Sequence, residues 1–496
     1  MNKDYTLLLG AGAEVLYGMP SGAEFAAAVF LERSRLKAEK DLLKAQLGRI
    51  PLDDAWVPYR KWLGIGSTLR PRVTGVVDRD FDAVIVDGLS ANRESVLDWL
   101  ADFDTKFQLL AKTLLNKAEQ EVFGGVKPGK PIRVRGVHDE RVSKFFNSDT
   151  FRRLVALLGQ SDIDKDTIRS PIYLLSSVLI GVAAGASLQG HASEMAISPL
   201  DNVGELPDQM DLAQCVPTLS VRGSSRLTET WTDLRLINER MSGFATGAVH
   251  IANVLLGLVV NYQQWIGSLY HYLFRPYDSF AKFTKAVVFM RSAGEYISRC
   301  HSEASQSNKI GFYEDLLAAD HRPTVVATTN YTQLIDRSKI SSDIILHLNG
   351  KAEENFEPYL QRHTPSGKSN NEVGPITIPS LFVQSAVKPF TDFDLLRRYV
   401  HFHNETQRTR RLVVIGFGFN ADDGHINALV RDVLFDGCSV LVFDYDNLGH
   451  NGYIARLRLE GTPKHVRDCL IVKPINDKRQ SNGRPWLDVV TDTLNH

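Results

Sequence analysis

The chain has 496 residues, of which 43% are hydrophobic and 23% charged, and its formal net charge is −1 at pH 7. This length exceeds what one hydrophobic core usually organises, so we expect several domains or one domain with a large insertion. The balanced charge excludes a broadly basic surface for nucleic acid. No signal peptide is recognisable, and the apolar tracts at 172–188 and 244–260 contain polar residues, so we expect a cytoplasmic protein without a membrane span.

The first predicted element is a short strand at residues 5–9 that ends in glycines. It is followed by the residues of a candidate phosphate loop: Gly10, Ala11, Gly12, Ala13, Glu14, Gly18 and Pro20. An alanine-rich segment at 23–29 then indicates a helix. A strand that turns into a helix through glycines directs backbone N–H groups at the turn, where a nucleotide diphosphate usually sits. On this segment alone, a phosphate site and a tight strand-to-helix turn are about equally supported.

The middle of the chain is helical in character. Residues 92–100 predict a helix with Asn92 as its N-cap and with Val96, Leu97 and Leu100 on one face. Apolar residues at helical spacing continue through 225–275, so most of residues 105–315 is interpreted as a helical insertion. Its abundant apolar and aromatic side chains predict an interface with another subunit or a partner.

Four further strands are predicted in the second half of the chain, and each ends in a glycine or a polar residue. They cover 324–328, 344–348, 411–415 and 439–443, and are followed by Thr329 and Asn330, by Asn349, by Gly416 and by Asp444. In a parallel sheet, the carboxyl ends of the strands line one crevice, which is where open α/β sheets bind ligands. The sequence therefore predicts an α/β fold with a ligand site at this edge.

Four motifs in this order resemble the sirtuin (SIR2) fold, and in particular the SIR2-like NAD-consuming proteins of bacterial anti-phage defence. They are Gly-Ala-Gly with Gly-x-Pro at 10–20, Thr-Thr-Asn-Tyr at 328–331, His-Leu-Asn-Gly at 347–350 and Gly-Phe-Gly-Phe at 416–419. The resemblance covers about residues 1–100 and 320–496. It implies a Rossmann-like parallel-sheet core in two parts, 1–104 and 316–496, separated by the helical insertion at 105–315.

This resemblance implies an NAD glycohydrolase that cleaves NAD to nicotinamide and ADP-ribose and acts in defence by depleting NAD. Asn330 would contact the ribose and place the attacking water, and His347, with a near-neutral pKa, would accept a proton. The backbone N–H groups from Ala11 to Glu14 would hold the diphosphate, and Asp444 would bind the adenosine ribose. Gly10, Gly18, Pro20, Thr329 and Gly416 would complete the nucleotide site.

Three positions depart from the family pattern. Glu14 occupies the place of a serine, Thr332 replaces an aspartate, and Asn349 precedes Gly350 where the family has its general-base histidine. Because residues two apart on a strand point to the same face, His347 could serve the position that Asn349 faces, although an ordinary strand histidine is an alternative. Thr332 and Asn349 also support a second interpretation, a catalytically inactive SIR2-fold sensor or scaffold that binds a nucleotide.

The four cysteines form no Cys-x-x-Cys pair, so neither the zinc module of protein-deacylating sirtuins nor another metal site is expected. Buried free thiols are the simplest interpretation of all four. The resemblance implies a homo-oligomer or a complex with an operon-encoded partner, such as an ATPase or helicase, an Argonaute-like protein or a nucleotide pyrophosphatase. The sequence does not indicate which of these provides the trigger.

Overall fold

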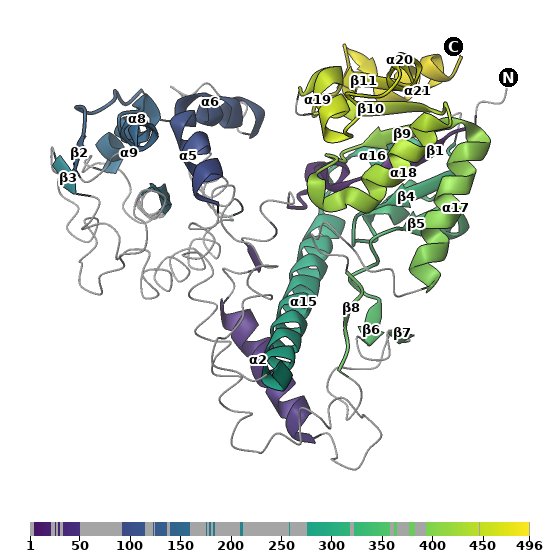
Figure 1. Ribbon diagram of the computed structural model, residues 1–496, viewed down its shortest axis with the longest axis horizontal. Helices are drawn as coiled ribbons and strands as arrows, with labels where there is room; N and C mark the ends of the chain where they lie inside the picture. The colour runs from purple at the N-terminus through teal and green to yellow at the C-terminus, as the bar shows by residue number, and fades with distance from the viewer. Residues whose placement is uncertain are drawn as a thin grey trace. The chain divides into compact units, whose positions relative to one another are not determined.

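A computed structural model of the chain describes most of the predicted core. The described segments are 4–20, 33–49, 92–114, 125–135, 139–158, 209–211, 275–317, 322–357, 362–364, 376–381, 393–445 and 447–495, together with a few single positions. The chain divides into two compact units (Figure 1). The first comprises residues 1–22, 42–58 and 286–496, and the second comprises 23–41 and 59–285. The expectation of an insertion at 105–315 stays a prediction.

The first unit is built on a six-stranded parallel sheet. Its strands are β1 (Thr6–Leu9), β4 (Val325–Thr328), β5 (Ile345–His347), β9 (Arg411–Ile415), β10 (Ser439–Asp444) and β11 (Leu470–Pro474). They lie in the order β11-β10-β9-β1-β4-β5, and all five neighbouring pairs are parallel. The predicted α/β fold with a parallel sheet is confirmed.

The strand order reverses direction next to β1. From β1 the chain proceeds outward through β4 to β5, and it then returns to β9 on the other side of β1 and proceeds to β10 and β11. At the reversal Leu9 lies opposite Thr328 on one side and Ile415 on the other. This is the strand order of Rossmann-like dinucleotide-binding folds, in which ligands bind outside the carboxyl ends of the strands at the reversal point.

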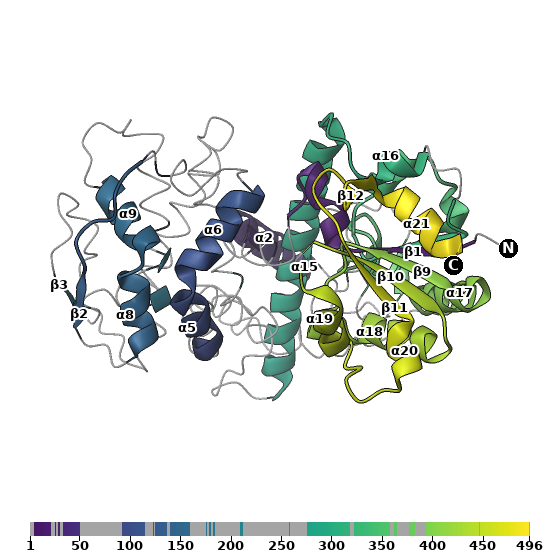
Figure 2. The same ribbon diagram turned by 90° about the horizontal axis from the view of Figure 1, so that it is seen from above.

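Helices cover both faces of this sheet, as Figure 2 shows from above. One face packs against α17 (Phe393–Thr409), α18 (Gly424–Phe435), α19 (Gly449–Arg456) and α20 (Lys464–Asp468). On the other face, the ring of Phe443 lies 6.0 Å from that of Trp486, which begins α21 (Trp486–Asn495), and Phe312 of α16 (Phe312–Leu317) lies 5.8 Å from Trp486. Burial on both faces explains why the strands are continuous apolar runs.

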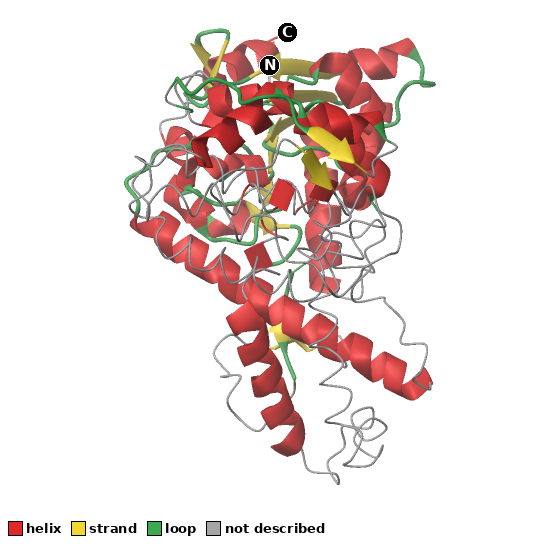
Figure 3. Cartoon of the chain, turned by 90° about the vertical axis from the view of Figure 1, so that its left-hand side faces the viewer, coloured by secondary structure: helices red, strands yellow, loops and turns green. Residues whose placement is uncertain are grey.

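Several shorter elements complete the described part of the first unit. They are η1 (Ala11–Ala13), η2 (Val15–Tyr17), η5 (Leu334–Ser338), η6 (Ser342–Ile344), η7 (Ala421–Asp423), the β12 (Gln480–Ser481) and β13 (Arg484–Pro485) pair, and a small sheet of β6 (Asn355–Glu357), β7 (Arg362–Thr364) and β8 (Ile378–Pro379). The boundary between the units falls inside α2 (Arg33–Arg49) and α15 (Arg275–Gln306). Helices predominate in the described secondary structure (Figure 3).

The described part of the second unit is mainly helical. It contains α5 (Arg93–Ala101), α6 (Phe103–Leu114), α8 (Glu140–Phe146), α9 (Asp149–Leu158) and the paired strands β2 (Arg133–Arg135) and β3 (Gln209–Asp211). The predicted helix at 92–100 is confirmed, and Val96, Leu97 and Leu100 are buried. Asn92 occupies the N-cap position, but its side chain does not cap the helix.

Some predictions fall outside the described residues. The helix at 23–29 and the apolar tract at 172–188 are described only at single positions, and almost all of the 225–275 segment and of the apolar tract at 244–260 is not described. Within the segments that the structure does describe, no helix is long and apolar enough to cross a membrane.

Candidate functional site

Two glycine loops meet at the reversal point of the sheet. The N–H of Gly10 donates to the carbonyl of Ile415, and the N–H of Gly12 donates to that of Gly416, both at 2.9 Å. A Cβ atom on Gly10 would lie 2.4 Å from the Gly416 oxygen, and a Cβ on Gly416 would lie 2.2 Å from the amide nitrogen of Ala13. Gly416 also has a φ of +68°, which favours glycine. Close packing of the two loops therefore requires these glycines.

The expected row of free amides along the first loop is wrong. The N–H groups of Gly10 and Gly12 bond to the Gly416 loop, and those of Ala13 and Glu14 donate to the carbonyls of Gly10 and Ala11, each at 3.0 Å. The chain closes into 3₁₀ turns here, and these turns use the N–H groups that an open turn would offer to a ligand. Between residues 10 and 14, only the N–H of Ala11 has no acceptor among the described residues.

The end of this loop contributes a buried carboxyl group. Glu14 follows η1 and is 3% exposed. Its Oε1 accepts hydrogen bonds from the hydroxyl groups of Tyr313, at 2.8 Å, and Thr332, at 2.7 Å. Burial raises the pKa of Glu14 to about 7, although the hydrogen bonds from Thr332, Tyr313 and Asn330 act in the opposite direction by favouring the ionised form.

Asn330 lies beside this carboxyl group, just beyond the carboxyl end of β4. The backbone of the preceding residue, Thr329, bonds to the carbonyl of Leu9 at the end of β1. The Asn330 side-chain Nδ2 donates to the carbonyl of Gly10 at 3.1 Å and to the hydroxyl of Tyr313 at 3.3 Å. No described residue donates to its Oδ1. The amide group is therefore held by its N–H groups, and its oxygen remains available as an acceptor.

His347 ends β5 and reaches the same cluster through Asn330. Its ring Nδ1 lies 3.2 Å from the backbone oxygen of Asn330, so the neutral ring donates there from Nδ1. Burial, and secondarily the positive charge of Lys351, lowers the pKa of His347 to about 3; Arg398 also lowers it, whereas the hydrogen bond to Asn330 raises it. The expectation of a near-neutral pKa is wrong because the ring is removed from water.

Asn349 has different partners from His347. The strand β5 ends at His347, so the same-face rule for strands does not extend to Asn349, which lies in the following turn. The Oδ1 of Asn349 accepts from the hydroxyl of Tyr399 at 3.0 Å and lies 3.4 Å from Nε2 of His425. These contacts connect Asn349 to α17 and α18, whereas His347 contacts Asn330.

The remaining predicted nucleotide contacts lie along the edge or beyond the cluster. Asp444 ends β10 and is buried; its Oδ2 accepts from the N–H of Gly449 at 2.9 Å and its Oδ1 from the hydroxyl of Tyr453 at 3.2 Å, so it holds the start of α19. Gly18 ends η2 with a φ of +94°, and the partly buried Pro20 follows shortly after. A ribose contact for Asp444 and nucleotide contacts for Gly18 and Pro20 stay predictions.

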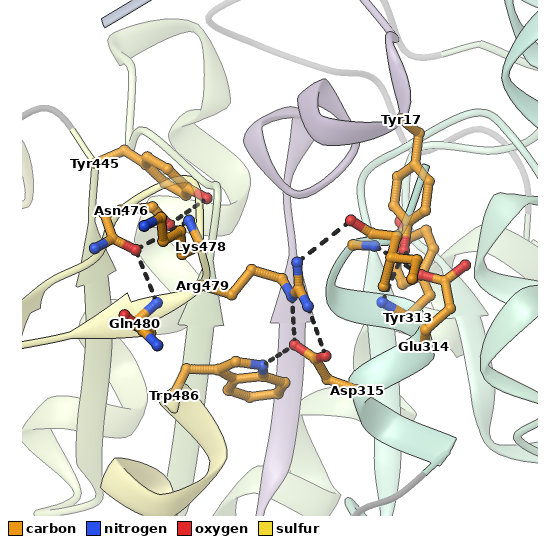
Figure 4. Close-up of polar contacts among 12 residues, drawn as sticks. Tyr17, Tyr313, Glu314, Asp315, Tyr445, Asn476, Lys478, Arg479, Gln480 and Trp486 are labelled. Carbon is orange, nitrogen blue, oxygen red and sulfur yellow. Dashed lines mark hydrogen bonds and ion pairs between the residues drawn. The ribbon is translucent and has the colours of Figure 1, made fainter. Parts of the chain in front are cut away.

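Tyr313, which lies in α16, packs against a layer of aromatic and charged side chains (Figure 4). The ring of Tyr17 stacks on that of Tyr313 with centroids 5.1 Å apart, and the Tyr17 hydroxyl donates to Glu314 Oε2 at 2.6 Å. Arg337 lies over the Tyr17 ring at 5.2 Å and pairs with Glu314 at 3.4 Å. Sequence reasoning did not identify Tyr313, because nothing in the pattern of 312–317 indicates that this short helix meets the end of β1.

The described residues contain no group of three or more His, Cys, Asp or Glu side chains arranged to hold a metal ion. Cys300 and Cys438 are buried free thiols and Cys469 is partly exposed, while Cys215 lies outside the described segments. Comparison of the chain with protein families, with curated proteins and with solved structures finds no match.

Proposed function

We propose that the protein is an NAD glycohydrolase that releases nicotinamide and ADP-ribose. The observation that carries the proposal is the buried polar cluster of Glu14, Tyr313 and Asn330 at the reversal point of a parallel sheet. Open α/β sheets bind nucleotides at this place, and a few convergent polar groups orient a bound ligand. NAD is proposed as the substrate because of the sequence resemblance, which rests on the four motifs and their order.

The proposed reaction needs little acid catalysis. The nicotinamide ring of NAD is positively charged, so it becomes a neutral molecule when it leaves. The barrier lies in forming an oxocarbenium-like centre at the ribose C1′ and in placing water against it. Asn330 suits this task, because its N–H groups are already bonded to Gly10 and Tyr313 and its Oδ1 is open to a ribose hydroxyl or a water. An oriented acceptor of this kind lowers the barrier by positioning.

The rest of the nucleotide is proposed to extend along the sheet edge. The N–H of Ala11, which has no acceptor among the described residues, is the donor that the first loop offers to a diphosphate oxygen; beside it Gly12 bonds to Gly416, and Thr329 bonds to Leu9. Asp444, on β10, lies further along the same edge and is the candidate for the adenosine ribose.

The proposal is tested by incubating the purified chain with NAD and separating the products by chromatography. We expect nicotinamide and ADP-ribose from the wild-type protein, in the presence of its activator or operon partner, and a large loss of both with Asn330→Ala. Asn476→Ala, at a polar residue near the surface hairpin β12–β13, is the control that keeps the product yield. The proposal would be refuted if the activated wild-type protein formed neither product while a known NADase, used as the positive control, formed both.

A second candidate is a catalytically inactive protein that binds NAD or another nucleotide as a sensor or scaffold. It is favoured by the low pKa of His347 and by the presence of Asn349, whose amide is not a base, where the family has its histidine. Calorimetry separates the two candidates: binding of NAD without any cleavage, with or without a partner, supports the inactive protein.

The biological setting is proposed from the sequence resemblance alone. The protein would be a cytoplasmic effector of anti-phage defence that depletes NAD, assembled as a homo-oligomer or with an operon-encoded ATPase or helicase, Argonaute-like protein or nucleotide pyrophosphatase. Cellular NAD should then fall after phage infection in cells that carry the wild-type gene and its neighbour, and should stay constant with Asn330→Ala.

A further inference from the structure

Glu14 is a buried carboxyl group whose hydrogen-bond partners are all neutral. It is 3% exposed, and within the described residues it forms no ion pair. Buried carboxyl groups are normally paired with a positive charge or absent, because an uncompensated charge is costly to remove from water. A hydrophobic or hydroxyl side chain would fill this position at lower cost, so the carboxyl group calls for a role beyond folding.

The hydrogen bonds around Glu14 leave part of its acceptor capacity for another partner. The hydroxyls of Tyr313 and Thr332 both bond to Oε1. A carboxylate has about four lone-pair positions, so with the additional hydrogen bond from the Asn330 amide one position remains for a ligand. The Tyr313 hydroxyl lies within hydrogen-bond distance of both Glu14 and Asn330 Nδ2, so the carboxyl group and the Asn330 amide form one cluster at the ends of β1 and β4.

We infer that Glu14 is a catalytic residue, the group that accepts the proton of the attacking water, in the role that the sequence motif assigns to His347. This inference rests on the proposed NAD hydrolysis. Water attacks the ribose C1′ as the bond from C1′ to the nicotinamide nitrogen breaks, and the electron pair of that bond leaves with nicotinamide. The proton of the water passes to the Glu14 carboxylate, which later releases it to solvent.

The comparison with His347 favours Glu14. A general base works best when its pKa lies near the working pH. Burial lowers the pKa of the His347 ring to about 3, and raises that of Glu14 to about 7. His347 contacts the backbone of Asn330, whereas Glu14 shares the Tyr313 hydroxyl with the Asn330 side chain, the group proposed to place the water.

The groups around Glu14 determine its titration. From α16 it faces Tyr313, which is stacked on Tyr17 from η2. Thr332 and Asn330 face it from the segment after β4, and beyond the Tyr17 ring Glu314 pairs with Arg337 at 3.4 Å. Since the ionised form of Glu14 is the proton acceptor, turnover should rise with pH through an apparent pKa of about 7.

The test compares isosteric variants of the full-length chain with its activator or operon partner. Glu14→Gln keeps the size and an acceptor oxygen but cannot take up the proton, so kcat should fall by roughly 10²–10⁴. Its affinity for NAD, measured by calorimetry, should stay near that of wild type. Glu460→Gln makes the same chemical change at an exposed carboxyl group in the turn between α19 and α20 and should keep turnover.

Two further variants give readouts that a structural role would not change. Thr332→Val removes a hydrogen bond that favours the ionised carboxylate, so the rise of kcat with pH should move to higher pH. Glu14→Asp keeps a proton acceptor, so it should retain a pH-dependent turnover above that of Glu14→Gln.

Each outcome decides between the claims. The assignment of Glu14 is overturned if Glu14→Gln turns over NAD as fast as the wild-type protein. It is also overturned if the pH profile is unchanged in Thr332→Val and Glu14→Asp. Neither result contradicts the proposed NAD hydrolysis. Loss of NAD binding in Glu14→Gln also overturns the assignment, because the carboxyl group would then serve binding. Absence of nicotinamide from the wild-type protein overturns the hydrolase itself.

Discussion

The folded protein holds the side chain of His347 in its neutral form, and this has a consequence for stability in acid. Burial lowers the pKa of His347 from 6.5 to about 3, so its contribution to stability is present above pH 6.5 and is lost as the pH falls. Between pH 6.5 and 4.5 we expect the free energy of unfolding of the wild-type protein to fall by about 2 kcal/mol relative to a variant without a titrating group at this position. Chemical unfolding of wild type and His347→Gln across this range measures the difference.

Glu14 provides a control for this measurement, because its effect on stability changes with pH in the opposite direction. Its pKa is raised from 4.5 to about 7, so the stability it contributes is present below pH 4.5 and is lost as the pH rises through 7. Relative to Glu14→Gln, the wild-type protein should therefore lose stability between pH 4.5 and 7. A His347→Gln variant whose acid sensitivity equals that of wild type would show that the ring is solvated.

At the scale of single residues, the sequence identified some members of the cluster and missed others. Asn330 was predicted through the resemblance, as the Asn of the Thr-Thr-Asn-Tyr motif that follows an apolar strand. Glu14 and Thr332 were noticed as separate departures from the family pattern, and the structure joins them by a hydrogen bond of 2.7 Å. Tyr313 could not be predicted, because its place depends on how α16 packs against the end of β1, and no local pattern records such a long-range contact.

At the scale of elements, the two glycine loops can be tested as one packed unit. Gly416→Ala places a Cβ against the backbone of Ala13 at a positive φ, so we expect a loss of about 2–4 kcal/mol in the free energy of unfolding. Gly461→Ala, with open space around its Cβ position, should change that free energy by less than about 0.5 kcal/mol. Equal stability of the two variants would contradict the close packing of the loops.

The same packing changes how a substitution at Gly12 is interpreted. A side chain on Gly12 would lie 2.8 Å from the Cα of Gly416, so a branched residue there disturbs the protein whether or not a nucleotide is bound. Loss of NAD binding in such a variant therefore does not locate the diphosphate.

The strands of the sheet were predictable, and the turns that follow them were not. Strands buried on both faces give apolar runs that can be recognised without any knowledge of their neighbours, and the runs at 324–328, 411–415 and 439–443 all correspond to strands. The 3₁₀ turns after β1 and the end of β5 at His347 depend on contacts with distant segments. The expected free amides of the first loop and the same-face argument for Asn349 failed for this reason.

The contact between α16 and the residues on either side of the β12–β13 hairpin provides a second test at this scale (Figure 4). Asp315 accepts two hydrogen bonds from Arg479, at 2.6 and 3.1 Å, and one from the indole N–H of Trp486 at 2.9 Å. Asp315→Ala leaves these donors without their acceptor, so we expect it to cost about 1–3 kcal/mol.

A surface ion pair serves as the control for this variant. Arg484 pairs with Asp492 at 2.7 Å, but both side chains are more than half exposed. Its removal by Asp492→Ala should cost less than about 1 kcal/mol. Thermal or chemical unfolding that ranks Asp492→Ala above Asp315→Ala would contradict the structural role of the Asp315 contact.

At the scale of the whole molecule, the sequence predicts self-association or a stable complex. The basis is the apolar and aromatic content of the middle of the chain, whose 225–275 segment is expected at the contact. Light scattering should give a mass that is a multiple of the monomer's, or that of a complex with the operon partner. A strict monomer, both alone and with that partner, would contradict this prediction.

The central claim is that NAD reacts at the cluster of Glu14, Asn330 and Tyr313 at the ends of β1 and β4. The most direct measurement is a crystal structure of the Asn330→Ala variant with NAD, in which loss of turnover preserves the bound substrate. We expect density for the nicotinamide ribose beside Glu14 and for the diphosphate at the N–H of Ala11. NAD bound away from the carboxyl ends of β1 and β4, or no density at a saturating concentration, would contradict the account.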